Sequence, residues 1–230
     1  MQRQFVIGDI HGCSRALRRL CEAVELHPGD TLITLGDYVN KGPDSRGVII
    51  WLLALDRALT LVPLRGNHDR LMQNARRDPL SYRQWLGSGG AATLASYRPA
   101  NAARGTLADV PQAHWAFLDR RLLPYFETAT HFFVHAGALP HLPLPKQPDT
   151  ALYEQRFIAP GRAHCSGKIM VCGHTAQQNG LPLATEHAVC LDTRCFARGW
   201  LSCLEPASGR VWQANERGET RCVPLVCGAA

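Results

Sequence analysis

One pattern recurs along this chain: a short apolar run ends directly in a polar cluster flanked by glycine. Short apolar runs bounded by turn residues indicate buried strands. Open α/β sheets place their ligands at the carboxyl ends of strands, so the pattern predicts an α/β fold in which these clusters meet. The clusters contain Asp9, His11, Asp37, Asn67, His68, His135 and His174.

Each cluster alone has an ordinary explanation. An aspartate and a histidine two residues apart after a strand more often form a turn with a helix N-cap, and a lone histidine is more often a satisfied polar residue. The coincidence of five clusters, each directly after an apolar run, favours a functional site instead. Histidines outside this pattern are interpreted as surface or core residues: His27, His114, His141, His164 and His187.

The donor types define the class of metal. Carboxylate and amide oxygens combined with imidazole suit first-row divalent ions, so manganese is expected, with iron or zinc as alternatives. Asp37 lies alone at its strand end, which makes it the natural bridge between two ions. The predicted ligands of the two ions are Asp9, His11, Asp37, Asn67, His135 and His174.

Such a centre favours an anionic substrate. Two divalent ions keep a positive charge even with two carboxylates and a bridging hydroxide, and this charge attracts a phosphate dianion. The ions lower the pKa of the bridging water, which becomes the nucleophile. His68 is then free to protonate the leaving oxygen as a general acid, and Lys41 could hold a phosphate oxygen.

Length and composition set the remaining bounds. The 230 residues contain no repeat, so a single domain over residues 1–230 is predicted. The formal charge of +6 comes from scattered arginines, without the aromatic interleaving that a nucleic-acid polymer needs. No membrane-spanning run or secretory signal is recognisable, so the expected location is the cytoplasm. The nine cysteines are interpreted mainly as buried thiols, although Cys222 and Cys227 could pair under oxidation.

The stretches between the strand ends complete the expected architecture. A helical pattern over residues 70–125 predicts a layer of helices over one face of the sheets. The proline-rich stretch 138–167 is predicted to be irregular and to form a wall or lid of the site. The strands expected between residues 188 and 225 predict an antiparallel sheet.

In this order the clusters resemble the motifs of calcineurin-type metallophosphoesterases, in the phosphoprotein phosphatase branch that includes bacterial diadenosine tetraphosphatases. The motifs occupy residues 8–12, 36–42, 66–69, 135–137 and 173–175. Segments 85–94 and 132–137 are similar to small bacterial serine/threonine phosphatase-like enzymes. The resemblance implies a four-layer αββα sandwich with two metal ions at the strand ends.

The resemblance also implies a role for each residue. Asp9, His11 and Asp37 would bind the first ion, and His68 resembles the general acid of the family. The second ion would be bound by Asp37, Asn67, His135 and His174. Asn67 and Lys41 would also contact the substrate phosphate.

Two positions depart from the family pattern. Asn40 stands where the family usually has an aspartate that orients the catalytic histidine, and Lys41 stands where it has an arginine. An amide cannot stabilise an imidazolium by charge, and lysine cannot form a bidentate fork, so a weaker acid and a looser phosphate clamp are predicted. A second phosphate-binding arginine is expected upstream of His174, with Arg156 as the first choice and Arg162 as the alternative.

Three functions remain open at this point. The first is a metal-dependent phosphatase acting on phosphomonoesters, chiefly phosphoproteins carrying phosphoserine, phosphothreonine or phosphotyrosine. The second is a hydrolase of dinucleoside polyphosphates such as diadenosine tetraphosphate, to which Asp69 and the Asn40-Lys41 pair are similar. The third is a metal-binding regulator with weak or no catalysis.

Overall fold

The computed structural model describes residues 3–159 and 161–225, and its strands form two mixed sheets. The first sheet has the strand order β11-β10-β9-β1-β2-β3. Its parallel half consists of β1 (Gln4–Ile7), β2 (Thr31–Thr34) and β3 (Thr60–Pro63). Its antiparallel half consists of β9 (Leu201–Glu205), β10 (Arg210–Ala214) and β11 (Thr220–Pro224), as the sequence predicted for this part of the chain.

The second sheet has the order β4-β5-β6-β8-β7. Its parallel strands are β5 (His131–Val134), β6 (Ile169–Cys172) and β8 (Ala188–Cys190). The short strands β4 (Tyr125–Glu127) and β7 (Leu183–Ala184) pair antiparallel at its two edges. The predicted assignment of β8 to the antiparallel sheet is wrong. This strand pairs in parallel with β6, and Cys190 lies opposite Cys172 in the register.

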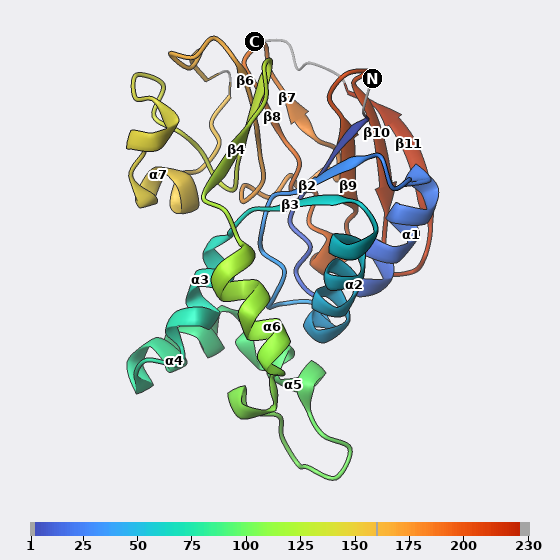
Figure 1. The fold of residues 1–230 in the computed structure, drawn as a ribbon, viewed down its shortest axis with the longest axis vertical. Helices are drawn as coiled ribbons and strands as arrows, with labels where there is room; N and C mark the ends of the chain where they lie inside the picture. The colour runs from blue at the N-terminus through green and yellow to red at the C-terminus, as the bar shows by residue number, and fades with distance from the viewer. Residues whose placement is uncertain (1–2, 160, 226–230) are drawn as a thin grey trace.

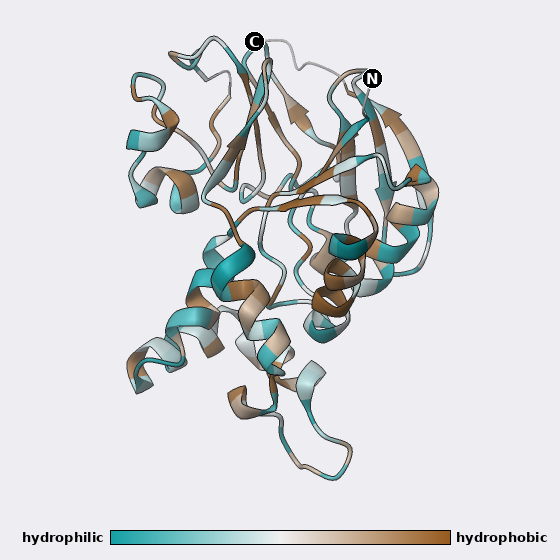
Figure 2. Cartoon of the chain, in the orientation of Figure 1, coloured by the Kyte–Doolittle hydropathy of each residue, from teal (hydrophilic) through white to brown (hydrophobic). Residues whose placement is uncertain are grey.

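The two sheets pack face to face through apolar side chains. Val6, Ile33 and Phe133 are fully buried in this inner core. Helices α1 (Ser14–Val24) and α2 (Ser45–Ala58) cover the outer face of the first sheet, and α2 is strongly apolar (Figure 2). The short helix α7 (Asp149–Glu154) packs on the outer face of the second sheet. The predicted αββα sandwich is therefore confirmed (Figure 1).

The stretch 70–125 contains several short helices, as its interrupted helical pattern predicted. They are α3 (Asn67–Asn74), α4 (Pro79–Trp85), α5 (Ala91–Tyr97) and α6 (Gln112–Ala116). A π-helical segment with a kink, Leu86–Gly90, joins α4 to α5. Figure 1 shows these helices below the sheets, where α5 packs against α2.

The proline-rich stretch 138–167 is less irregular than predicted. It contains a 3₁₀ turn, Leu144–Lys146, and α7, whose apolar residues Leu152 and Tyr153 are buried against the second sheet. Prolines at the starts of both helical pieces fit this conformation. Proline lacks a backbone N–H group, and at the start of a helix that group would have no partner within the helix. Within the described residues, none of the helices combines the length and apolarity needed to cross a membrane.

Candidate metal centre

The strand ends of both sheets meet at one place. Asp9 and His11 follow β1, and Asp37 follows β2. Asn67 and His68 begin α3 just after β3. His135 and His174 follow β5 and β6 of the second sheet. The structure thus brings together all the polar clusters that the sequence singled out.

Asp37 lies at the middle of this assembly and is buried. Its Oδ2 atom is 3.3 Å from His11 Nε2, and its Oδ1 atom is 3.6 Å from His135 Nε2. The backbone amide of His68 donates to the same Oδ1 at 2.9 Å. Potential metal-donor atoms form two groups that share Asp37, namely His11–Asp37–His68 and Asp9–Asp37–His135. Asp9 therefore lies in the group with His135, and His68 lies in the group with His11.

The imidazole rings are oriented by the backbone. His11 Nδ1 donates to Val39 O at 3.1 Å, and His135 Nδ1 donates to Leu35 O at 2.8 Å. A carbonyl only accepts, so the Nε2 atoms of both rings carry lone pairs on the side of Asp37, and the ammonium group of Lys41 donates to that of His11. His135 Nε2 also lies 3.0 Å from the Oδ1 atom of Asn67.

These contacts test whether the residues fit a cation. His135 Nε2 and Asn67 Oδ1 are both acceptors, and His174 Nδ1 lies 3.3 Å from the same Oδ1. Converging lone pairs repel one another unless a positive charge lies among them. The donor set is thus suited to divalent ions of the first transition row.

Burial shifts the pKa values of these groups in two directions. It raises the pKa of Asp37 to about 7 and that of Asp9 well above its usual range, where the charges of neighbouring aspartates add to the effect. Burial lowers the pKa of His11 and His135, and it lowers that of His174 to about 4. Neutral imidazoles bind metals without releasing a proton, whereas the carboxylates must lose theirs first.

The affinity of the metal-free protein for Mn²⁺ should therefore increase with pH up to at least about 7. Below that pH a proton must leave Asp37 before the carboxylate can bind a cation. Each displaced proton adds up to about tenfold in affinity per pH unit. Calorimetric titration in two buffers of different ionisation enthalpy measures the affinity and the released protons. An affinity that is constant between about pH 5 and pH 7 would contradict this prediction.

The backbone around the centre is held in an unusual conformation. His11, Asp37, Asn40, Lys41 and His174 all have positive φ angles, between 46° and 72°. Such left-handed conformations are uncommon for residues other than glycine and cluster at functional sites.

The buried carboxylate of Asp69 holds the strained turn at Asp37. It accepts hydrogen bonds from the amides of Asp37 at 2.9 Å, Tyr38 at 3.0 Å and Gly66 at 2.9 Å. Gly66 is required here, because a Cβ atom at this position would lie 2.1 Å from Asp37 Oδ1. Asp69 therefore supports the loop that presents Asp37 without facing the donor groups itself.

His68 contacts Asn40 inside the protein. Asn40 Nδ2 lies 2.9 Å from His68 Nδ1. The Oδ1 atom of Asn40 accepts from Trp85 Nε1 at 2.8 Å and from Thr93 Oγ1 at 3.1 Å. These residues are buried, and no sequence pattern predicted their contact with Asn40, because Trp85 and Thr93 lie on α4 and α5, far along the chain from it.

Lys41 lies at the rim of the centre. Its Nζ atom is 3.1 Å from His11 Nε2 and lies 4.6 Å from the centre of the Phe196 ring. Its backbone amide donates to Gly89 O at 3.2 Å, which ties this loop to the helical segment below. The ammonium group is thus held beside the donor atoms by a short, fixed loop.

Asp192 is a further buried carboxylate that sequence reasoning missed. It follows β8, and its Oδ1 atom accepts from the amide of Arg194 at 3.0 Å. Burial is the main reason why the pKa of Asp9 is raised, and the charge of Asp192 is the next cause. A signal existed, because Asp192 also ends an apolar run, but no glycine marks the position.

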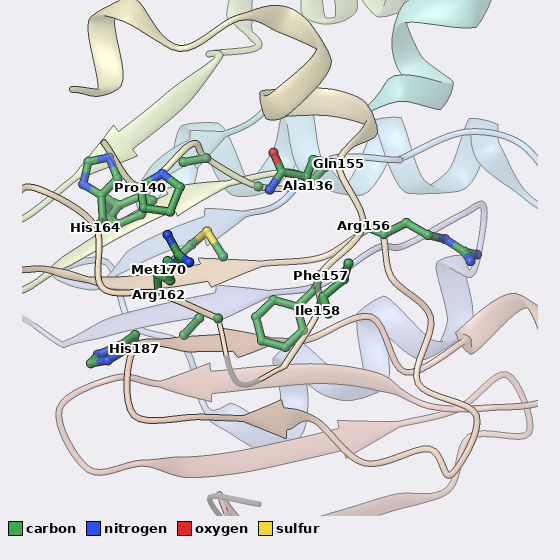
Figure 3. Close-up of a pocket in the computed structure, with 15 residues that line it drawn as sticks. Ala136, Pro140, Gln155, Arg156, Phe157, Ile158, Arg162, His164, Met170 and His187 are labelled. Atoms are coloured by element: carbon green, nitrogen blue, oxygen red, sulfur yellow. The ribbon is translucent and has the colours of Figure 1, made fainter. Parts of the chain in front are cut away.

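The two candidate arginines differ in their surroundings. Both arginines line an apolar cavity of about 280 Å³, and Figure 3 shows the Arg156 side chain extending away from the other labelled side chains. The pKa of His174 is lowered by burial first, and the charge of Arg156 adds to the effect. The charge of Arg156 thus acts on His174, although those of His135 and Lys41 act on it more strongly.

The fold and this centre define a class of protein, and comparison with known families agrees. A family model described as calcineurin-like phosphoesterase matches residues 3–178. The chain belongs to the calcineurin-like phosphoesterase family, as the motifs indicated.

Two relatives with known names match shorter segments. Serine/threonine-protein phosphatase 1 of Salmonella typhimurium is 40% identical over 87 residues, which cover 37% of this chain and 38% of that protein. The symmetrical bis(5'-nucleosyl)-tetraphosphatase of Proteus mirabilis is 47% identical over 66 residues, which cover 28% of this chain and 23% of that protein. In both cases the match spans well under half of the relative's length.

Solved structures share the fold over nearly the whole chain. A crystal structure of a candidate diadenosine tetraphosphatase has a TM-score of 0.66 at 24% identity and covers 99% of this chain and 95% of its own. The cold-active protein-tyrosine phosphatase of a Shewanella species has a TM-score of 0.65 at 16% identity and covers 96% of this chain and 80% of its own. At these identities the likeness describes the fold alone.

Proposed function

We propose that this protein is a metal-dependent hydrolase of phosphoanhydride bonds, with dinucleoside polyphosphates of the bis(5'-nucleosyl)-tetraphosphate type as substrates. Family membership supports a phosphoester hydrolase. Several relatives of 39% to 47% identity carry the name symmetrical bis(5'-nucleosyl)-tetraphosphatase. These matches favour the second of the three functions above over the first, which was a phosphoprotein phosphatase.

The contact between Asn40 and His68 is the observation that carries this choice. The indole nitrogen of Trp85 can only donate, so the atom of Asn40 that faces it must be the amide oxygen. The amide nitrogen of Asn40 therefore faces His68 and donates to Nδ1. His68 is consequently neutral, with its proton on Nε2.

A neutral His68 suits some leaving groups better than others. Asn40 supplies no negative charge to stabilise an imidazolium, so His68 can donate a hydrogen bond but is a poor source of a full proton. A nucleotide released from a phosphoanhydride is a weakly basic phosphate and needs little protonation. A serine or threonine alkoxide is strongly basic and needs a strong general acid.

The other residues of the centre would bind and orient the substrate. Asp9, His11, Asp37, Asn67, His135 and His174 are the proposed ligands of two divalent ions, with manganese expected and iron or zinc as alternatives. When bound, the ions would activate a water molecule and polarise the phosphoryl oxygens. Lys41 and Arg156 would hold oxygens of the polyphosphate chain, Lys41 as a point charge and Arg156 through its planar fork.

A phosphatase acting on phosphoproteins is the second candidate. The 40% identity to serine/threonine-protein phosphatase 1 favours it. Among its substrates, phosphotyrosine carries the least basic leaving oxygen and is the one that a neutral His68 would serve best.

The Mn²⁺-loaded protein distinguishes these functions when it is assayed on diadenosine tetraphosphate, p-nitrophenyl phosphate, and phosphoserine and phosphotyrosine peptides. The proposal expects the highest kcat/KM on diadenosine tetraphosphate. A higher value on the phosphoserine peptide would overturn it. Bound metal without turnover of any substrate would favour the third function, a metal-binding regulator.

A further inference from the structure

A second cavity opens beside the metal centre and has a volume of about 330 Å³. Three separate parts of the chain line it: the end of the Lys41 loop, the loop that follows β8, and the turn between β10 and β11. The lining residues are Pro43, Cys195, Phe196, Arg198, Asn215, Glu216 and Arg217. Its size lies within the range of small-molecule sites.

Phe196 forms a wall between this cavity and the metal centre. Its ring packs edge to face against the ring of His11, with the centroids 5.0 Å apart. The ammonium group of Lys41 lies over the same ring. A molecule in the cavity would therefore lie one side chain away from the residues proposed to bind phosphate.

The lining combines apolar walls with a basic rim. Pro43, Cys195 and Phe196 present mainly apolar surface. Glu216 also lines the cavity, and its Oε1 atom accepts a hydrogen bond from the backbone amide of Ala16 at 2.9 Å.

The two arginines at the rim differ in their pairing. Arg217 is paired with Glu219 at 2.9 Å. Arg198 is exposed and forms no ion pair among residues 3–159 and 161–225. Its guanidinium is thus free to bind an anion at the mouth of the cavity.

We propose that this cavity is a nucleotide subsite. The base packs against Phe196 inside the cavity, and a phosphate of the same nucleotide pairs with Arg198 at the rim. The polyphosphate then passes Lys41 toward the metal centre. The assignment of a dinucleoside polyphosphate as the occupant rests on the proposed function, whereas nucleotide binding in the cavity does not require turnover.

The test compares the Mn²⁺-loaded wild type with the variants Arg198→Gln and Arg57→Ala. Arg57 is an exposed arginine in the last turn of α2 that lines neither of the two cavities, and it serves as the control. ADP and pyrophosphate are titrated as inhibitors of p-nitrophenyl phosphate hydrolysis, and KM is measured for diadenosine tetraphosphate.

The inference expects ADP to inhibit the wild type more tightly than pyrophosphate does. Arg198→Gln should raise the inhibition constant of ADP about tenfold, because a charge-assisted hydrogen bond is lost. The same variant should leave kcat/KM for p-nitrophenyl phosphate within about twofold, because this small substrate does not reach the rim. Arg57→Ala should change neither value.

Other outcomes separate this inference from the proposed function. Equal inhibition by ADP in the wild type and Arg198→Gln would overturn the subsite, as would ADP binding no tighter than pyrophosphate. If diadenosine tetraphosphate is hydrolysed with the same KM by both proteins, the proposed function holds and the subsite fails. If it is not hydrolysed but ADP inhibition weakens in the variant, the subsite holds and the proposed function fails.

Discussion

Replacing Asp37 with alanine is expected to abolish catalysis and to remove tight binding of both proposed metal ions. Asp37 is the residue shared by the two donor groups, so its loss weakens both at once. Metal ions contribute several kcal/mol to stabilising the transition state, so turnover should fall at least about 1,000-fold. Metal content after gel filtration and steady-state turnover measure the two effects.

The folded state of Asp37→Ala should survive. Burial without a cation raises the pKa of Asp37 to about 7, which means that the ionised carboxylate is unfavourable inside the metal-free protein. The variant should therefore keep or exceed the wild-type Tm in the presence of a chelator, but should lose the increase in Tm that Mn²⁺ gives. Asp149→Ala, at an exposed aspartate paired with Arg70, is the control that should retain both ions. Two tightly bound ions in Asp37→Ala would contradict the shared role.

Replacing Asn40 with aspartate is expected to convert His68 into a stronger acid. Trp85 and Thr93 can still donate to one oxygen of the new carboxylate, which leaves the other oxygen facing His68 Nδ1. The pKa of His68 is lowered to about 3, chiefly by burial, with the charge of Lys41 as the next cause. A carboxylate at 2.9 Å favours the imidazolium and raises this pKa.

The gain should depend on the leaving group. General acid catalysis is worth roughly 100-fold or more, so hydrolysis of alkyl phosphates should increase by at least about tenfold in Asn40→Asp. Hydrolysis of diadenosine tetraphosphate should change little. A series of aryl phosphates gives the dependence of kcat/KM on the basicity of the leaving group, which should become shallower.

Two further variants complete this experiment. Asn40→Leu removes the contact with His68 without adding charge, and it should not improve any substrate. The double variant Asn40→Asp with Lys41→Arg adds a bidentate phosphate clamp, so it should exceed Asn40→Asp on phosphomonoesters. An unchanged dependence on the leaving group in Asn40→Asp would contradict the assigned role of Asn40.

The sequence was informative wherever a functional residue directly follows a strand. Asp37 and His135 are 98 positions apart, yet both could be identified because each follows an apolar run and has a glycine within two positions. Parallel strands bring such ends together, so a local pattern carries information on a distant contact. Asp192 shows the limit of this rule, since it ends a strand without such a glycine.

Contacts between different layers left no comparable signal. Trp85 reaches Asn40 from α4, and Phe196 reaches His11 from the loop after β8. Neither pair follows a sequence period, because both depend on how separate elements pack. The strand β8 was misassigned for a similar reason. Its residues are as apolar as those of an antiparallel strand, and nothing in them shows that they pair in parallel with β6.

The proposed metal ligands come from both sheets, and this has a consequence for the stability of the fold. Asp9 and Asp37 come from the first sheet, whereas His135 and His174 come from the second. A cation held by both pairs would crosslink the two halves of the sandwich. Removal of divalent ions should then accelerate amide hydrogen exchange in β1, β2, β5 and β6 together. The metal concentration would thus determine the lifetime of the folded protein as well as its catalytic rate.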